Sequence, residues 1–167
     1  MSSPNELRRE LVDPTAYIAP GAIVLGDVTI GAESSIWFNA VVRGDTESIR
    51  IGKQTNVQDL CMLHADPGFP CVLGDQVTVG HAAIVHGATV EDGCMIGMRA
   101  VVMNGAKIGQ GSLIAVGAVV TEGTVVPPGS VVMGVPGKIR REVTEEDRKR
   151  MAHAALHYAE QAKKFQQ

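Results

Sequence analysis

Three histidines in the middle of the chain, His64, His81 and His86, are the residues whose type and spacing point most directly to chemistry. Imidazole is a common metal ligand, and three imidazoles that leave one position open are typical of catalytic zinc. An ion held in this way lowers the pKa of bound water and supplies hydroxide near neutral pH. A single surface histidine is usually not a ligand, so the prediction depends on whether the fold gathers all three.

The elements that must position these histidines are predicted by a repeat of six residues. Aliphatic residues recur at this spacing from residue 18 to residue 132, as at Ile18, Val24 and Ile30, and glycine often follows them. A period of six fits neither an amphipathic helix nor a long alternating strand, but it fits short strands joined by tight turns. Because no single repeat can bury its apolar face alone, the coils must stack. We therefore predict an all-β solenoid, a parallel β-helix.

The chain is expected to comprise three regions, with the β-helix domain at residues 18–137. Residues 1–17 are expected to cap the solenoid, and residues 138–167 to form a linker and an amphipathic helix. Thr144 precedes three acidic residues, as a helix N-cap does, and predicts a helix packed along the solenoid over residues 144–165. Its apolar face would be formed by residues at helical spacing, namely Met151, Ala154, Ala155, Tyr158, Ala162 and Phe165.

The composition excludes several other classes of protein. A net charge of −3 gives no electrostatic case for nucleic-acid binding, and no apolar run approaches the roughly 18 residues that a membrane span needs. The three cysteines show neither the spacing of a zinc ribbon nor that of a disulfide framework. The first residues lack the charged-then-apolar pattern of a signal peptide. We therefore expect a soluble protein of the reducing cytoplasm.

The register of the repeat predicts which side chains meet. Arg43, His64 and His86 each directly follow an aliphatic repeat residue. These aliphatic residues, Val42, Leu63 and Val85, are three repeat steps apart once the inserted residues are subtracted. They should therefore form one column on successive coils. Parallel strands lie about 4.8 Å apart, so His64 and His86 can reach one ion. The inserted residues are expected to form surface loops.

His81 is expected to lie on a different face from this column. It comes two residues after Val79, on the preceding face of the coil that carries His86, so a corner separates the two. A single chain is therefore not expected to bring His81 to the same ion, whereas a homotrimer in which the neighbour supplies it removes the difficulty. The register also puts Gln58 beside the His81 turn, one coil away. We predict a metal site shared between subunits.

Two further histidines, His153 and His157, lie one turn apart on the predicted helix. Such a pair can bind a metal, but no third ligand is in sequence range. We interpret them as residues of a solvated helix face.

Five short motifs resemble those of the γ-class carbonic anhydrase family of hexapeptide-repeat proteins. They are Arg43-Gly44-Asp45, Asn56-Val57-Gln58-Asp59, Leu63-His64, Val79-Gly80-His81 and Val85-His86-Gly87. The resemblance implies a left-handed winding of the coils and a homotrimer. It also implies that His64, His81 and His86 bind Zn²⁺, or in some members Fe²⁺ or Co²⁺, across the subunit interface. The activity implied is the reversible hydration of CO2 to bicarbonate by metal-bound hydroxide.

The same resemblance implies roles for the residues around the metal. In the family, the residues that match Arg43, Asp45 and Asp59 form salt bridges that fix the interface and the site geometry. Gln58 would orient the bound water or the substrate, and Asn56 would line the pocket.

Tyr158 matches a tyrosine that reaches toward the metal from the helix in many short members of the family, although a simple packing role is an equal reading.

The chain departs from the family's pattern in two places. Thr46 follows the Arg-Gly-Asp motif where the archetypal enzyme has an acidic residue. The long acidic loop with its glutamate proton shuttle is reduced to residues 65–71, with Pro67 at the offset of the shuttle. Asp66 is the nearby carboxylate and, with water, would carry protons away.

Two alternative functions remain open at this point. Many hexapeptide-repeat proteins are acyltransferases, some short-loop relatives resemble acyl-CoA thioesterases, and Val135-Pro136-Gly137 is similar to acyltransferase endings. A non-catalytic trimeric scaffold stabilised by metal is the third hypothesis, because a fold does not fix a function.

Overall fold

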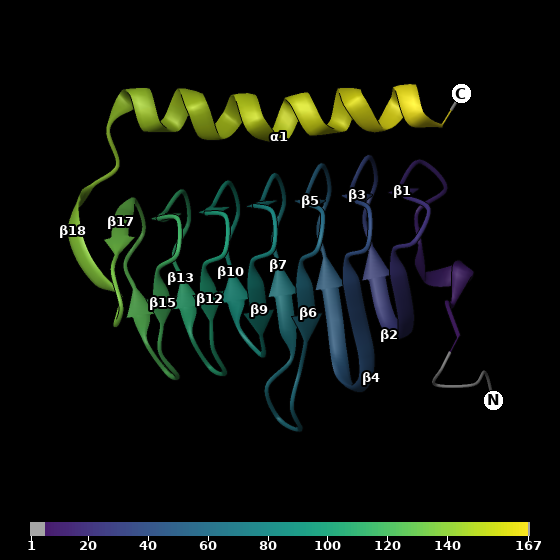
Figure 1. The fold of residues 1–167 in the computed structure, drawn as a ribbon, viewed down its shortest axis with the longest axis horizontal. Helices are drawn as coiled ribbons and strands as arrows, with labels where there is room; N and C mark the ends of the chain where they lie inside the picture. The colour runs from purple at the N-terminus through teal and green to yellow at the C-terminus, as the bar shows by residue number, and fades with distance from the viewer. Residues whose placement is uncertain (1–5, 167) are drawn as a thin grey trace.

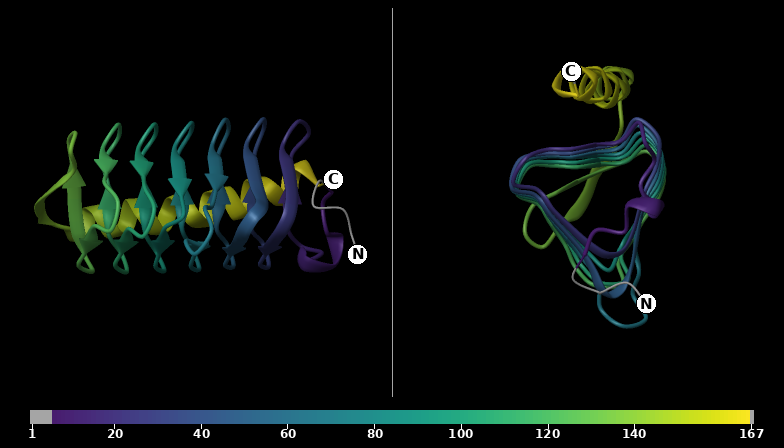
Figure 2. Two further views of the ribbon diagram at one scale, coloured as in Figure 1. Left: turned by 90° about the horizontal axis from the view of Figure 1, so that it is seen from below. Right: turned by 90° about the vertical axis from the view of Figure 1, so that its right-hand side faces the viewer.

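The computed structural model describes residues 6–166, and these wind into a stack of triangular coils with one long helix alongside (Figure 1). Seen down the stack, the coils superpose as a triangle and the helix lies outside one of its sides (Figure 2). The predicted fold class, an all-β parallel β-helix with a C-terminal helix, is confirmed.

One side of the triangle is an eight-stranded sheet that faces the helix. Its parallel strands are β1 (Tyr17–Ile18), β3 (Ser35–Ile36), β5 (Asn56–Val57), β8 (Thr78–Val79), β11 (Met95–Ile96), β14 (Leu113–Ile114) and β17 (Ser130–Met133). The antiparallel strand β18 (Lys138–Glu142) closes its end. The sequence predicts a linker for this last segment, whereas the structure forms a strand there.

The other two sides are joined because β2 (Ile23–Ile30) and the longer β4 (Val41–Ile51) pair along their length and continue from one side to the next. One side carries β6 (Met62–His64), β9 (Ile84–His86), β12 (Val101–Val102) and β15 (Val119–Val120). The other carries β7 (Cys71–Leu73), β10 (Thr89–Val90), β13 (Lys107–Ile108) and β16 (Val125–Val126). A short 3-10 helix, Arg9–Leu11, precedes the first coil.

The strand register agrees with the spacing of the repeat. Val42 pairs with Leu63, and Leu63 pairs with Val85, across the two insertions. His64 is then directly opposite His86 on neighbouring parallel strands. The predicted column is therefore confirmed for these two histidines.

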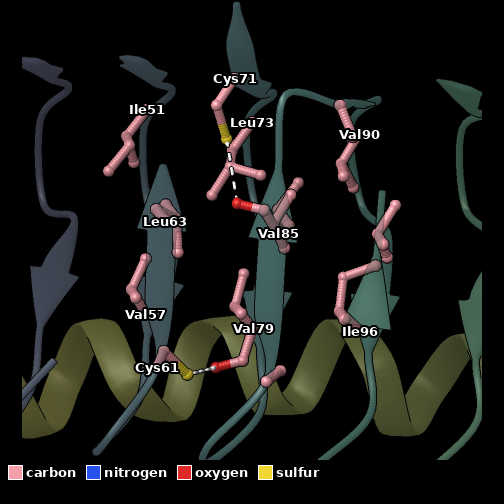
Figure 3. Packing of buried hydrophobic residues seen from close by; sticks show 14 of the residues in the cluster. Ile51, Val57, Cys61, Leu63, Cys71, Leu73, Val79, Val85, Val90 and Ile96 are labelled. Atoms are coloured by element: carbon pink, nitrogen blue, oxygen red, sulfur yellow. Dashed lines mark hydrogen bonds between the residues drawn. The ribbon is translucent and has the colours of Figure 1, made fainter. Parts of the chain in front are cut away.

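The core consists of aliphatic side chains stacked coil on coil (Figure 3). Val57, Val79 and Ile96 form one such row and are fully buried. Burial of this kind contributes about 1.5–3 kcal/mol per aliphatic side chain, and here it must come from small residues because the triangle is narrow. Cys61 and Cys71 also face inward and are free, and burial raises the pKa of both thiols to about 12.

Helix α1 (Glu145–Phe165) runs along the eight-stranded sheet and contacts β1, β3, β5 and β8. Small residues make this close approach feasible, since Ala155, Ala159 and Ala162 are buried on its inner face together with Met151. Near its C-terminal end, Phe165 and Tyr158 pack edge-on against Trp37 at ring-centroid distances of 5.5 and 5.3 Å. No helix among residues 6–166 is long and apolar enough to cross a bilayer.

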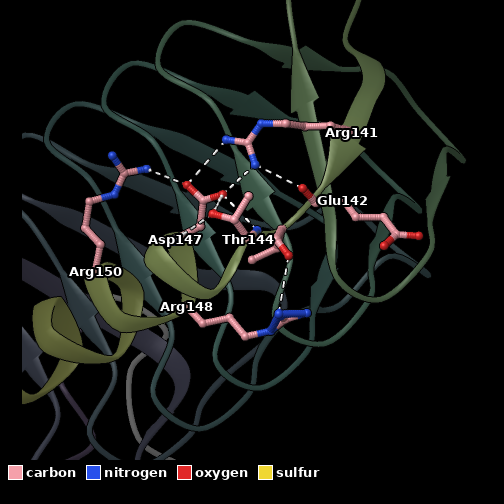
Figure 4. Close-up of polar contacts among 7 residues, drawn as sticks. Arg141, Glu142, Thr144, Asp147, Arg148 and Arg150 are labelled. Atoms are coloured by element: carbon pink, nitrogen blue, oxygen red, sulfur yellow. Dashed lines mark hydrogen bonds and ion pairs between the residues drawn. The ribbon is translucent and has the colours of Figure 1, made fainter.

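The helix begins with a capping box (Figure 4). The Thr144 hydroxyl accepts a hydrogen bond from the Asp147 backbone N–H, and the Asp147 carboxylate accepts one from the Thr144 backbone N–H at 3.0 Å. Arg141 on β18 and Arg150 on the helix both pair with this carboxylate. The hydrogen bond from Arg141, with those from Thr144, holds the pKa of Asp147 well below its usual range.

The Asp147 cluster predicts a specific dependence of stability on pH. Because the folded pKa is lowered, the stabilisation is fully present above the unfolded pKa of about 3.9 and is lost as the pH falls through the folded value. We expect Asp147→Asn to lower the melting temperature at neutral pH, with a difference from the wild type that shrinks below about pH 4. Thermal melts across this range test it, with the exposed neighbour Glu146→Gln as control. A difference that is constant with pH would contradict the expectation.

Candidate metal centre

Two imidazoles on neighbouring strands form the centre of the candidate site. The Nδ1 atom of His64 lies 3.0 Å from the Nε2 atom of His86. Two nitrogens bound to one tetrahedral zinc at about 2.0–2.1 Å would be roughly 3.3 Å apart, so the pair is already spaced as ligands are. Both side chains are half-buried at the surface of the solenoid.

The second nitrogen of each ring is held by an acceptor. The Nε2 atom of His64 lies 3.2 Å from a carboxylate oxygen of Asp45, and the Nδ1 atom of His86 lies 2.8 Å from Oδ1 of Asn104. Each acceptor requires its nitrogen to carry the proton, which leaves a lone pair on the other nitrogen of each ring. When both rings are neutral, the two lone pairs face each other, an arrangement that a shared proton or metal ion stabilises. The donor set therefore fits a metal ion.

Asp45 is held in turn by Arg43, whose Nη1 lies 2.7 Å from the second carboxylate oxygen. Partial burial acts to raise the pKa of Asp45, but the hydrogen bonds from Arg43 and His64 together outweigh it and lower the pKa. Asp45 therefore remains an anion that accepts from His64. Thr46, which replaces an acidic residue of the family's pattern, has its hydroxyl 3.5 Å from the same carboxylate.

Asp66 joins the pair from the short loop after β6. One of its carboxylate oxygens and one nitrogen from each of His64 and His86 all lie within 4.8 Å of one another. Oδ2 of Asp66 accepts a hydrogen bond of 2.8 Å from Nδ2 of Asn104. Asn104 was not singled out in the sequence. Val102 pairs with Val85, so the register puts Met103 in the column of His86, and Asn104 comes one residue later in the turn after β12.

His81 lies in a second group, at the turn between β8 and β9. Its Nδ1 is 2.7 Å from Oδ2 of Asp59, its backbone N–H donates to Oε1 of Gln58, and its Nε2 is 3.4 Å from the Tyr158 hydroxyl. Asp59 fixes the proton on Nδ1, so Nε2 carries the lone pair. The Gln58 amide is buried and donates to Oδ1 of Asn56 at 3.1 Å, which fixes its orientation.

Tyr158 reaches His81 from α1. Burial, and then the nearby Asp59 carboxylate, raise the pKa of its phenol. The hydroxyl therefore stays protonated at neutral pH and can donate to Nε2 of His81. The structure brings together Asn56, Gln58, Asp59, His81 and Tyr158.

The structure keeps the two groups apart within one chain. Among residues 6–166, the potential metal-ligand cluster consists of His64, Asp66 and His86, and His81 is not part of it. The side chain of His81 is 44% exposed, and within one chain its Nε2 contacts the Tyr158 hydroxyl. His153 and His157 are exposed on α1 and stack on each other at 5.9 Å between ring centroids, and His157 also packs edge-on against Tyr158.

Fold and site together define a hexapeptide-repeat protein with histidines arranged as metal ligands. Two family models, "Bacterial transferase hexapeptide (six repeats)" and "Hexapeptide repeat of succinyl-transferase", match residues 87–122 and 70–98. A "Probable carbonic anhydrase" of Methanocaldococcus jannaschii is 53% identical over 89% of this chain and 93% of its own length. The mitochondrial "Gamma carbonic anhydrase 3" of Arabidopsis thaliana is also 53% identical, over 89% of this chain and 60% of the longer plant protein. The chain belongs to the γ-class carbonic anhydrase family.

A solved structure shows how closely the fold is shared. The crystal structure of a "hexapeptide transferase family protein" from Anaplasma phagocytophilum is 37% identical and superposes with a TM-score of 0.89. The match covers 92% of this chain and 91% of that protein. The solenoid and its helix are therefore common to relatives whose descriptions differ in activity.

Gly87, directly after His86, provides a test of how tightly the site is packed. Its φ is +57°, and a Cβ atom there would overlap Oδ1 of Asn104 and lie 2.9 Å from Cβ of Phe69. Gly123 has the same register position and a φ of +64°, but open space around its Cβ position. We expect Gly123→Ala to cost roughly 1–2 kcal/mol through backbone strain alone. Gly87→Ala should cost roughly 1–3 kcal/mol more through overlap.

Denaturant unfolding of both variants at one protein concentration measures the difference. An equal loss in the free energy of unfolding for both variants would show that Asn104 and Phe69 do not fill the space beside Gly87.

Proposed function

We propose that the protein is a γ-type carbonic anhydrase that interconverts CO2 and bicarbonate at a metal site shared between subunits of a homotrimer. The observation that carries this proposal is the 3.0 Å distance between Nδ1 of His64 and Nε2 of His86, with an acceptor on the far nitrogen of each ring. The sequence identity between this chain and carbonic anhydrases supports the proposed reaction. We also propose that the protein is cytoplasmic.

The ligands would be Nδ1 of His64, Nε2 of His86 and Nε2 of His81 from a neighbouring subunit. Each of these atoms is the nitrogen left unprotonated by an acceptor on the other side of its ring. Zn²⁺ fits this set, and Fe²⁺ and Co²⁺ suit imidazole equally. A divalent ion bound there supplies the Lewis acidity that makes water a nucleophile near neutral pH.

The chain's own residues would orient the reactants and move the proton. Gln58 has its amide oriented by Asn56 and by the His81 backbone, so it is suited to position water or CO2. Arg43 and Asp45 hold His64, and Asp59 holds His81. Asp66 is the carboxylate beside the ligand pair that would accept the proton released in each turnover. Tyr158 would donate a hydrogen bond near Nε2 of His81.

Exposed apolar side chains lie beside the three histidines and support a subunit interface there. Met62 and Ile84 are each 36% exposed and lie two residues before His64 and His86, on the same outward side of β6 and β9. Leu60 is 63% exposed at the corner that also carries His81. Contiguous apolar surface of this kind is typical of association sites. The proposed trimer would bury these residues and bring His81 to the neighbour's pair.

Acyl transfer is the second candidate, because a close structural relative at 37% identity is described as a transferase. That chemistry needs one histidine as a base and does not require the three oriented lone pairs. A thiol-release assay with acyl-CoA distinguishes it from CO2 hydration.

A shared site predicts that two inactive variants restore each other. His81→Ala and His86→Ala should each lower CO2 hydration, measured by stopped flow on protein of known metal content, by at least about 100-fold. Mixed trimers assembled from both variants contain some sites with all three ligands, and random mixing should recover roughly a quarter of wild-type activity.

His153→Ala, a histidine on the exposed face of α1, is the control and should keep full activity. Active single variants would contradict the ligand assignment, and absence of recovery in mixed trimers would contradict a shared site. A metal-replete wild type without hydration would exclude the proposed reaction.

A further inference from the structure

Among residues 6–166, Asn104 is the side chain that is hydrogen-bonded to both His86 and the loop carboxylate Asp66. It lies in the turn after β12, one coil beyond His86, and is half-buried. Its Oδ1 is 2.8 Å from Nδ1 of His86, and its Nδ2 donates to Oδ2 of Asp66 at 2.8 Å. The two ends of a single amide therefore serve two residues of the site, one as acceptor and one as donor.

The surroundings hold Asn104 in this position. Oδ1 lies in the space left by the missing side chain of Gly87, and the backbone N–H of Gly105 donates to the Gly87 carbonyl at 2.7 Å. Phe69 covers the same space, and its own N–H donates to the Asp66 carbonyl at 2.9 Å, which closes the loop. The amide therefore sits in a fitted recess between two coils.

The position of Asp66 raises a chemical problem for the site. With three histidines bound, a catalytic metal keeps one position open for water or substrate. A carboxylate oxygen within 4.8 Å of both ligand nitrogens is close enough to move into that position. Asp66 coordination would give a closed four-ligand site, typical of structural zinc.

We propose that Asn104 is a positioning residue that keeps the fourth coordination position open. Its Oδ1 holds the proton on Nδ1 of His86, so that Nε2 faces the metal. Its Nδ2 retains the Asp66 carboxylate beside the ion and outside its ligand set. This inference rests on the proposed function for its catalytic meaning, but the arrangement itself is tested by metal binding alone.

The two ends of the amide are tested separately with Co²⁺, whose visible absorption reports its coordination. Asn104→Leu removes both contacts and should weaken Co²⁺ binding about 10–100-fold, as loss of a group that orients a ligand does. Asn104→Asp keeps an acceptor for His86 but repels Asp66. Its Co²⁺ affinity should not fall, while its spectrum should change as Asp66 enters the ligand set. Adding Asp66→Asn to Asn104→Asp should restore the wild-type spectrum.

Two controls separate this role from general damage. Glu122→Leu changes the exposed residue at the same register position one coil later, and should leave Co²⁺ affinity and spectrum unchanged. Asp66→Asn alone should leave the spectrum unchanged and lower the affinity by no more than roughly tenfold, since Asp66 is a nearby charge and not a ligand in the wild type. Thermal melts verify that every variant is folded.

Wild-type Co²⁺ affinity in folded Asn104→Leu would overturn the proposal. So would a changed spectrum in Asp66→Asn, or a loss of affinity greater than the roughly tenfold expected from removing a nearby charge, because Asp66 would then be a ligand. Wild-type protein that binds Co²⁺ with the expected responses but hydrates no CO2 would refute the proposed function and retain the role of Asn104.

Discussion

The arrangement of the site depends on one electrostatic constraint, two imidazole lone pairs directed at each other across 3.0 Å. Lone pairs at this distance repel unless a cation lies between them, so the groups around them must keep the rings in place. Asp45 and Asn104 do so by accepting the proton on the far side of each ring. The same logic recurs at His81, where Asp59 holds Nδ1 and Nε2 faces the Tyr158 hydroxyl. This common orientation supports the proposal that the three rings are ligands of one ion.

The solenoid provides the regular spacing that this constraint needs. Each coil repeats the backbone of the one before, so side chains at one register position are separated by a single strand spacing. Rows of small aliphatic residues hold the coils in register, and the two insertions leave the pairing of Leu63 with Val85 intact. The loop after His64 can therefore vary in length and composition without moving the histidines. In this chain it brings Asp66 and Phe69 back over the neighbouring coil.

Helix α1 and the corner at His81 form the other half of the site. Ala82, directly after His81, has a φ of +58°, and Leu60 and Arg99 have similar values at the same corner of neighbouring coils. Such backbone is costly for residues with a side chain and persists where the surrounding structure enforces it. Tyr158 reaches this corner because it and Phe165 both pack against Trp37, which fixes this end of the helix. The helix thus connects the first coils of the solenoid to the group around His81.

The sequence by itself determined the solenoid, the helix after Thr144 and the pairing of His64 with His86, because a strict period of six fixes which residues share a face. It also separated His81 from that pair, since counting steps along the repeat identifies the corner between them. Only the tertiary structure revealed β18 and the double contact of Asn104, because both depend on partners from distant segments. The direction of each imidazole, set by Asp45, Asn104 and Asp59, was likewise decided in three dimensions. A repeat predicts the position of a residue on its coil, whereas hydrogen-bond partners decide in which direction its reactive atom points.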